Sequence, residues 1–435
     1  MSEGTTQVGE ANPKDWGWVE RHVWTERMLE ALVTGVKGGV WFSLIDKVQR
    51  PSTLAAAWAG VKRNKGGAGS DHQSIEDFEE NLEEEIMRLS ESLRAGSYRP
   101  RPIRRAYIDK AGSKEKRPLG IPCVRDRVVQ GALRMVIEPI FENAFVNHSY
   151  GFRPRRGCKD ALREVERLLH AGYMFVVDAD IKAYFDNIPH APLMADIGCY
   201  IADGRVLELI GSFLKQDVLE DMALWTPEKG SPQGAVVSPL LANLYLHPVD
   251  TAMEAAGFEM IRYADDLVVL CRSEAEALNA LDTLGRLTTE RGLTLHPDKT
   301  RLVNVSIPGE GFDFLGYHFE RGTRWPRAKS MRKLKDTIRT KTKRSNGRSL
   351  AKIIEDVNGT LKGWFEYFKH SHKPTFPKVD KWVRRRLRSI LRKRIRLHGT
   401  SRGHDHYRWP NKFFQAHGLF NLVEAHRALL QPSSR

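Results

Sequence analysis

The sequence predicts an α+β protein in which a region of mixed strands and helices precedes a helical, strongly basic region. Segments typical of strands alternate with segments typical of helices from Tyr98 to about residue 320. Two of the strand-like segments carry acidic residues. From Arg321 onward the apolar spacing becomes helical, and residues 321–435 contain 31 Lys/Arg and 7 Asp/Glu.

The composition is that of a soluble globular protein. With 435 residues, 41% hydrophobic and 28% charged, the chain can form a large catalytic unit with one or two smaller lobes. No apolar run approaches the roughly 18 residues that a membrane span needs, and the polar stretch from Met1 to Asn12 lacks the core of a signal peptide. The four cysteines form no CxxC pair, so neither a zinc ribbon nor a disulfide framework is expected. We expect a cytoplasmic protein without a membrane partner.

Residues 1–97 are predicted to form an N-terminal extension. Tryptophans cluster in its first 56 residues without a motif that we can interpret. Residues 57–97 have helical spacing on either side of a glycine-rich loop, residues 65–69. From Ile75 to Leu93, apolar residues recur every three or four positions, which predicts one amphipathic helix.

Two acidic segments stand out within residues 98–320. Met174–Ile181 is aromatic and β-branched and contains Asp180 near its end. Met260–Cys271 is typical of a strand, an acidic turn and a second strand, with Asp265 and Asp266 at the bend. Either segment alone could occur by chance. The occurrence of both in this order, with a glutamine-glycine loop between them, is less plausible as a coincidence.

Carboxylates on buried strands are costly unless a cation satisfies them, and their oxygens suit Mg²⁺. Two such ions about 3.5–4 Å apart activate an attacking hydroxyl and stabilise a leaving pyrophosphate. That chemistry needs a carboxylate from each of two adjacent strands, which these segments supply. Asp178 lies two residues before Asp180 and faces the same side of the strand, but we interpret it as structural.

The charge asymmetry indicates a polyanionic partner. Residues 321–435 have a net charge of +24, whereas residues 1–320 hold 38 basic and 47 acidic groups, a net of −9. Such a division favours nucleic acid as the partner of the C-terminal part. The run Lys381–Arg396 combines an apolar stripe with cations that could contact phosphates without reading sequence. The candidate contacts are Arg384, Arg385, Arg388, Arg392, Lys393 and Arg396.

Seven segments occur together in one order. They are Lys116-Arg-Pro-Leu-Gly-Ile-Pro, His148-Ser-Tyr-Gly-Phe-Arg-Pro, Asp180-Ile-Lys-Ala-Tyr-Phe-Asp, Ser231-Pro-Gln-Gly-Ala-Val-Val-Ser-Pro-Leu-Leu-Ala-Asn, Tyr263-Ala-Asp-Asp, Leu295-His-Pro-Asp-Lys-Thr and Phe314-Leu-Gly-Tyr. With them the chain resembles the reverse transcriptases encoded by bacterial group II introns, which also act as maturases for their intron RNA. The likeness runs from about Lys62 to the C-terminus.

The resemblance implies a right-hand polymerase fold. Residues 98–320 would form the fingers and palm, an antiparallel sheet with helices, and residues 321–398 an α-helical thumb or maturase domain. Residues 399–435 would be a short DNA-binding-like tail, without the HNH endonuclease of many relatives. The implied activity is RNA-directed DNA synthesis with two Mg²⁺ ions, together with binding of intron RNA to assist splicing and mobility in the bacterial cytoplasm.

The resemblance also assigns roles to single residues. Asp180 and Asp265 would bind both metal ions, with Asp266 in support and the backbone carbonyl of Ile181 completing one shell. Phe185 stands where DNA-making polymerases hold a bulky aromatic residue that would clash with a ribose 2′-hydroxyl. The substrates would therefore be dNTPs.

The triphosphate contacts are implied by a glycine-containing loop between Lys110 and Arg117 that resembles a fingers hairpin. A cation at each end could clamp a triphosphate, although a later lysine of the loop could replace Lys110. Gln233 would contact the incoming nucleotide or the template base. Lys299 would lie near the triphosphate, with a solvated surface lysine as the alternative.

The partners implied are group II intron RNA, an RNA template with a DNA primer, target DNA and dNTPs. Two other functions remain open. One is a splicing-only RNA-binding protein with a decayed polymerase site, against which the intact Asp180, Asp265 and Asp266 argue. The other is a reverse transcriptase recruited to phage defence or CRISPR, against which the resemblance of the basic region to the family's thumb argues.

Overall fold

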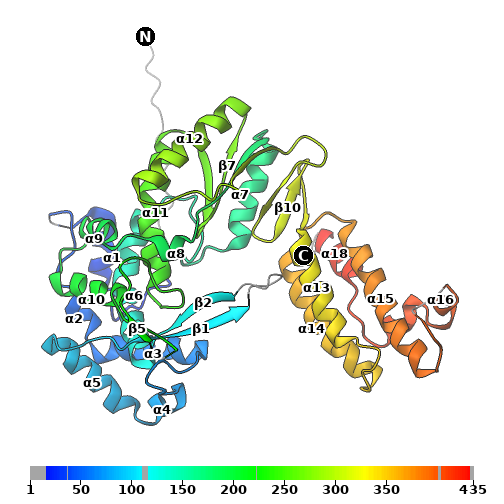
Figure 1. Ribbon diagram of the computed structural model, residues 1–435, viewed down its shortest axis with the longest axis horizontal. Helices are drawn as coiled ribbons and strands as arrows, with labels where there is room; N and C mark the ends of the chain where they lie inside the picture. The colour runs from blue at the N-terminus through cyan, green and yellow to red at the C-terminus, as the bar shows by residue number, and fades with distance from the viewer. Residues whose placement is uncertain (1–15, 37, 110–115, 222, 400–402, 432–435) are drawn as a thin grey trace.

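The computed structural model describes residues 16–36, 38–109, 116–221, 223–399 and 403–431. It confirms the α+β class, with helices around antiparallel sheets. Figure 1 shows N-terminal helices at lower left, a sheet with covering helices at the top, and basic helices at right. None of the helices in the described ranges is both long and apolar enough to cross a membrane.

The N-terminal helices surround one long central helix, α6 (Val124–Ala144), and share its hydrophobic core. Trp24 is fully buried, and its indole Nε1 donates a hydrogen bond to the carbonyl of Met135 at 3.1 Å. The expected extension is therefore part of the main core rather than a separate unit. Its helices are α1 (Glu26–Thr34), α2 (Ile45–Val48), α3 (Pro51–Asn64), α4 (Ile75–Glu80) and α5 (Leu82–Ala95).

The single helix expected from Ile75 to Leu93 is wrong, because the structure has two. Asn81 leaves the helical backbone, with φ −119° and ψ 32°, and stands at the end of α4 and the start of α5. The apolar spacing continues across this break, because both helices bury the same face against the core. Spacing alone therefore could not reveal it.

The fingers sheet has the strand order β2-β1-β4-β5. β1 and β2 form an antiparallel hairpin, while β1 and β4 are parallel. The N–H of Gly120 on β2 donates to the carbonyl of Gln233 at 2.7 Å. Gly234 has φ +110°, and a Cβ there would lie 2.3 Å from the Gly120 oxygen, so only glycine fits. The strands are β1 (Ile103–Asp109), β2 (Lys116–Ile121), β4 (Val218–Glu220) and β5 (Ala223–Trp225).

The palm sheet is antiparallel throughout, with the order β6-β7-β3-β8. On β3, Val177 and Ala179 face the main core, where α11 (Ser238–Ala255) and α12 (Glu274–Glu290) cover the sheet. Val176 faces the other side, which packs on α7 (Cys158–His170). Because side chains alternate along a strand, positions 178 and 180 share that second face. The strands are β6 (Glu259–Tyr263), β7 (Asp266–Cys271), β3 (Phe175–Asp180) and β8 (Arg301–Asn304). Between β3 and β4 lie α8 (Tyr184–Asn187), α9 (His190–Gly198) and α10 (Gly204–Leu214).

The boundary expected between residues 320 and 321 falls inside a hairpin. β9 (Phe312–Phe314), β10 (Tyr317–Glu320) and β11 (Thr323–Pro326) form a small antiparallel sheet, and β10 pairs with β11 across a two-residue turn. The helical region begins only at α13 (Ala328–Lys341). The excess of basic residues starts before the last strand ends, which misplaced the boundary.

The thumb consists of α13, α14 (Leu350–Phe368) and α15 (Thr375–Arg394) around their own core. The short helices α16 (Asp405–Arg408), α17 (Asn411–Ala416) and α18 (Leu422–Leu430) join that core. Phe414 and Leu422 are fully buried in it. Residues 403–431 therefore complete the thumb instead of forming a separate tail.

Candidate active site

The register of the palm sheet brings the predicted carboxylates together. β3 pairs with β7 so that Asp180 stands directly opposite Asp266. Asp265 immediately precedes β7, in the turn that follows β6. All three residues line one cleft of about 820 Å³, together with Asp178 and Ile181. The arrangement therefore supplies acidic side chains from two adjacent strands to a single space.

The turn before Asp265 is held by a buried guanidinium. Arg262 on β6 is only 1% exposed and is ion-paired with Asp250 of α11, whose Oδ1 accepts from Nε at 2.7 Å. Its Nη1 donates to the carbonyl of Ala264 and to Oδ1 of Asn243, both at 2.9 Å. Ala264 itself has φ +60°, an uncommon backbone conformation for alanine. Several bonds from one side chain thus fix the shape of the acidic turn.

A second segment presses against the same turn. A Cβ on Gly151 would lie 2.2 Å from the backbone nitrogen of Ala264, so only glycine permits this approach. The carbonyl of Gly151 accepts from Nδ2 of Asn243 at 2.6 Å, and the N–H of Tyr150 donates to the carbonyl of Arg262 at 2.9 Å. Residues 148–153 and the acidic turn therefore form one packed unit.

Cations neutralise two of the strand carboxylates. Nζ of Lys299 lies 3.0 and 3.1 Å from the two carboxylate oxygens of Asp180. The guanidinium of Arg301 lies 3.2 Å from Asp178, which agrees with a structural role for that acid. Burial first, and then the negative charges of Asp178 and Asp265, raise the pKa of Asp266 to about 7.

These observations fit a divalent cation. Carboxylate oxygens are its preferred ligands, and a cation would offset both the burial of Asp266 and the neighbouring charges of Asp178 and Asp265, which together raise the pKa of Asp266. Elsewhere in the described structure, the ligand atoms of His148, Glu164 and Glu259 lie within 4.8 Å of one another. The carboxylate oxygens of the three aspartates are not all this close together. In the present state Asp180 is turned to Lys299 instead.

The backbone at Ile181 forms an isolated bridge with Leu295. The bridge uses the carbonyl of Asp180, which accepts from the N–H of His296 at 2.7 Å, and the N–H of Lys182, which donates to Thr294 at 2.9 Å. The Ile181 carbonyl takes no part in this pairing. Ile181 lines the cleft, as a residue that binds a metal ion there must.

Three of the predicted nucleotide contacts line the cleft, namely Phe185 on α8, Gln233 and Lys299. Phe185 is half-buried, and its carbonyl accepts from the N–H of Ser231 at 2.8 Å. The ring of Phe152 meets the Phe185 ring edge-on, with centroids 6.5 Å apart. These contacts fix the position of the aromatic ring at the wall of the cleft.

The structure describes only part of the loop that is expected to bind the triphosphate. Lys110 lies outside the described residues. Arg117 belongs to β2, where it pairs with Ile108, but its side chain also lies outside the described part of the chain. Lys116, which follows the loop, lines the cleft together with Lys299.

Five of the six predicted nucleic-acid contacts have exposed or half-buried side chains on or beside α15. They are Arg384, Arg385, Arg392, Lys393 and Arg396, of which Arg384 and Arg392 are half-buried. Arg396 has φ +60° and lies just beyond the helix end. The four cations other than Arg392 are available to a phosphate backbone.

Arg388 is wrong as a surface contact, and half-buried Arg392 is held in an ion pair. Arg388 is 1% exposed and donates to the carbonyl of Trp409 and to Oδ1 of Asn411, both at 2.9 Å. Arg392 forms a salt bridge with Asp405 at 3.1 Å. Both side chains tie α15 to the segment that follows it. The helical spacing could not show this, because it does not reveal which face the later helices cover.

Several residues that shape the site were not predicted from the sequence. Arg327 and Lys329 line the cleft, and Arg262 supports the turn from below. One signal was present for Arg262, because an arginine inside the apolar run of β6 needs a buried partner. Its partner, Asp250, is the one acid among the buried residues of α11.

Two family models match the chain. The model described as reverse transcriptase (RNA-dependent DNA polymerase) matches residues 108–319. The model described as the group II intron, maturase-specific domain matches residues 331–409. The two matches correspond to the fingers and palm and to the thumb.

Two similar proteins support the same family. The chain is 41% identical over 202 residues to the group II intron-encoded protein LtrA of Lactococcus lactis subsp. cremoris, covering 46% of this chain and 33% of that protein. It is 31% identical over 319 residues to protein YkfC of Escherichia coli (strain K12), covering 64% of this chain and 83% of that protein. The chain thus spans about a third of LtrA and most of YkfC.

Among solved structures, a chain of a partial Cas6-RT-Cas1–Cas2 complex shares 25% identity, with a TM-score of 0.37 over 57% of this chain and 41% of that chain. This structural likeness is too low to add to the evidence of the sequences. The resemblance inferred from the motifs is confirmed by the family models and by YkfC. The chain belongs to the group II intron-encoded reverse transcriptases that carry a maturase domain.

Proposed function

We propose that this protein is an RNA-directed DNA polymerase that copies RNA into cDNA and binds group II intron RNA to assist splicing and mobility in the bacterial cytoplasm. Its partners would be the intron RNA, an RNA template with a DNA primer, target DNA and dNTPs. The observation that carries the proposal is the palm register, which sets Asp180 opposite Asp266 beside the turn of Asp265.

Two Mg²⁺ ions bound by Asp180 and Asp265, with Asp266 and the Ile181 carbonyl in support, would supply activation of the primer 3′-hydroxyl and stabilisation of the leaving pyrophosphate. Arg262 holds the acidic turn so that Asp265 is presented to the cleft. Phe185, which lines the cleft, would clash with a ribose 2′-hydroxyl and so favour dNTPs. Gln233 is positioned by the contact between its carbonyl and Gly120.

Lys299 would have one role before the nucleotide binds and another after it binds. While Asp180 has no metal, the Lys299 ammonium neutralises it at 3.0 Å. If Asp180 bound metal ions instead, Lys299 would be free to meet a triphosphate in the same cleft. A lysine suits this exchange because its charge moves on a flexible stem.

The thumb would supply the RNA contacts of the maturase function. Arg385, Lys393 and Arg396 are exposed, and Arg384 is half-buried beside them. Such cations release counterions on binding phosphate, which provides affinity without sequence preference. The maturase-specific match over residues 331–409 supports intron RNA as the ligand.

The test is primer extension on an RNA template with a DNA primer, dNTPs and Mg²⁺. Asp265→Ala should lower the extension rate by about a thousandfold or more, since metal ions contribute several kcal/mol of transition-state stabilisation. Asp298→Ala is the matched control, because this acid lines the same cleft but lies in the segment that precedes β8. It should retain extension within about tenfold.

Two results would contradict the proposal. Extension by pure Asp265→Ala protein at a rate within about tenfold of the wild-type rate would refute the metal role of that residue. If the wild-type protein speeds intron splicing but extends no primer under any Mg²⁺ concentration, the splicing-only function is the correct one.

A further inference from the structure

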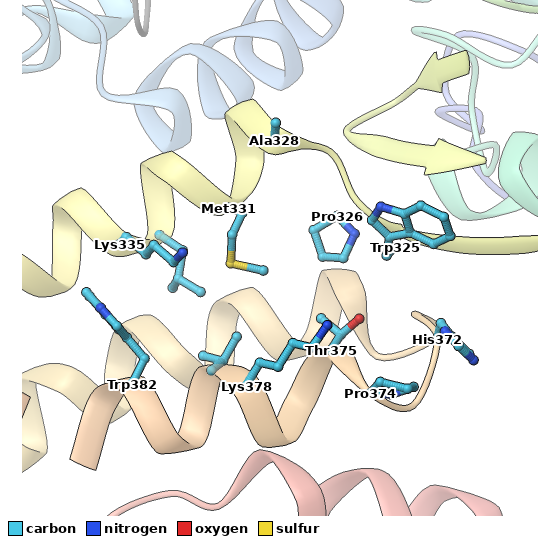
Figure 2. A pocket seen from close by; sticks show the side chains of 12 residues that line it. Trp325, Pro326, Ala328, Met331, Lys335, His372, Pro374, Thr375, Lys378 and Trp382 are labelled. Carbon is cyan, nitrogen blue, oxygen red and sulfur yellow. The ribbon is translucent and has the colours of Figure 1, made fainter. Parts of the chain in front are cut away.

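The thumb contains an apolar groove that the proposed polymerase chemistry does not use. It has a volume of about 620 Å³ and lies between α13 and α15. Its walls include Trp325, Met331, Leu334 and Trp382. In Figure 2, Met331 points from α13 into the groove, and the two tryptophans lie toward its opposite ends. Flat aromatic surfaces and a flexible thioether thus face one open space.

Cations stand on both sides of this groove. Lys335 projects from α13 and Lys378 from α15 (Figure 2). None of the described residues that line the groove is acidic, and within the described ranges neither lysine forms a salt bridge. An apolar floor between two uncompensated positive charges is complementary to a ligand with flat apolar faces and negative charge at its edges.

The groove shares a wall with the catalytic cleft. Along the junction of β11 and α13, Pro326 and Ala328 line the groove, whereas Arg327 and Lys329 line the cleft. The N–H of Arg327 donates to the carbonyl of Gly316 at 3.0 Å, which fixes this junction on the β9–β10 turn. A single layer of the chain therefore separates the groove from a nucleic acid in the cleft.

We propose that this groove is a binding site for unpaired RNA nucleotides. Bases would stack on Trp325 and Trp382 and pack on Met331, while their phosphates contact Lys335 and Lys378. Paired strands hide the faces of their bases, so the apolar walls select single-stranded segments. The lysines and the net charge of +24 over residues 321–435 favour RNA over an apolar protein segment. This inference rests on the proposed function, which supplies RNA as the ligand.

Photo-crosslinking provides a direct test. The full-length protein is irradiated with a short uridine-rich RNA that carries one 4-thiouridine, and crosslinked peptides are mapped by mass spectrometry. Crosslinks are expected at Trp325, Met331 or Trp382. Unlabelled single-stranded RNA should remove them, whereas the same RNA in a full duplex should not.

A pair of charge-reversal variants tests the rims. Lys335→Glu with Lys378→Glu should weaken binding of this RNA about tenfold and lower the salt slope by about 1.4, since each phosphate contact on a single strand contributes about 0.7. The control, Lys333→Glu with Lys362→Glu, makes the same change in net charge at exposed positions that do not line the groove. It should change affinity by less than about threefold.

Several outcomes overturn the groove assignment. Crosslinks only outside the groove, equal loss of affinity in both variants, or crosslinks from the matching DNA oligonucleotide but not from RNA would each contradict it. A change in self-association of Lys335→Glu/Lys378→Glu without crosslinks would identify a protein interface instead. Primer extension by the same preparation separates the two proposals: extension without groove crosslinks rejects the groove alone, and groove crosslinks without extension reject the polymerase alone.

Discussion

At the scale of single residues, the acidic turn depends on side chains that never reach the substrate. Arg262 is enclosed between α11 and the turn, and it joins Asp250, Asn243 and the Ala264 carbonyl. A buried charge in this position is stable only while its partner remains, because removal of one partner leaves the other desolvated and unpaired.

Arg262→Met should therefore destabilise the protein by roughly 3–5 kcal/mol, because Asp250 is then buried without its cation. Chemical denaturation followed by circular dichroism measures this change. The double variant Arg262→Met with Asp250→Leu should recover part of the loss. Arg286→Met, which removes an exposed pair with Glu290, is the control and should change stability by no more than about 1 kcal/mol. Equal effects of the two single variants would contradict the proposed support.

Phe185→Ala should raise ribonucleotide incorporation, since the ring at the cleft wall no longer excludes a 2′-hydroxyl. The measurement is the ratio of kcat/KM for a dNTP to that for the matching rNTP. We expect the ratio to fall about a hundredfold, which corresponds to roughly 2.7 kcal/mol. Phe258→Ala, a half-buried ring outside the cleft, serves as the control. An unchanged ratio for Phe185→Ala would show that another residue selects the sugar.

The sequence located the acidic residues of the site but not their supports. Asp180, Asp265 and Asp266 were found because strand-like runs end in acids and motifs follow one another in a recognisable order. Whether an arginine serves a phosphate or a neighbouring helix depends on packing between distant segments. For that reason Arg388 was assigned to the surface although it lies inside the thumb.

At the scale of elements, runs of β-branched residues located the strands well, and breaks in helices were missed. The segments expected at 174–181 and 260–271 correspond to β3 and to the β6–β7 hairpin. The break at Asn81 depends on one residue leaving helical geometry, which leaves the apolar spacing intact. The hairpin of β10 and β11 extended past the point where the composition changes.

The first turn of α6 carries a buried acid outside the catalytic cleft. Asp126 accepts from the hydroxyl of Tyr98 at 2.6 Å and from the N–H of Arg101 at 2.9 Å. Burial outweighs these hydrogen bonds and raises the pKa of Asp126 to about 6, from an ordinary value of 3.8. The folded state therefore holds a proton that the unfolded state has already lost between about pH 4 and pH 6.

This acid should consequently make the protein less stable as pH rises through that window, by up to about 3 kcal/mol. Urea denaturation at a series of pH values from 4 to 7 measures the effect. Asp126→Asn removes the titrating group, so the difference in unfolding free energy between the two proteins should change across the window and level off above pH 6. A constant difference over the whole range would show that Asp126 is ionised in the folded state.

At the scale of the whole molecule, opposite charges are divided between two regions. The catalytic part, residues 1–320, has a net charge of −9, and residues 321–435 have +24. Nucleic acid should therefore be attracted first to the thumb and only then enter the acidic cleft, where the proposed Mg²⁺ ions would compensate the carboxylates.

Affinity for intron RNA should fall steeply with salt because of this division. Arg385→Ala with Lys393→Ala should reduce the slope of log affinity against log salt by between about 1 and 2, since two phosphate contacts are lost. Filter binding from low to physiological salt measures the slope. Arg163→Ala with Arg167→Ala is the control, because these exposed arginines of α7 already pair with acids. An affinity of the wild-type protein that does not change with salt would reject the phosphate contacts altogether.

The contact between Gly151 and Ala264 also bears on how such enzymes can be recombined. Because no side chain fits between the two backbones, the hairpin of residues 260–271 is compatible only with a chain that has glycine at position 151. A chimaera that exchanges the catalytic hairpin between distant homologues therefore has to keep or transfer this glycine, although more than a hundred residues separate it from the hairpin in the chain.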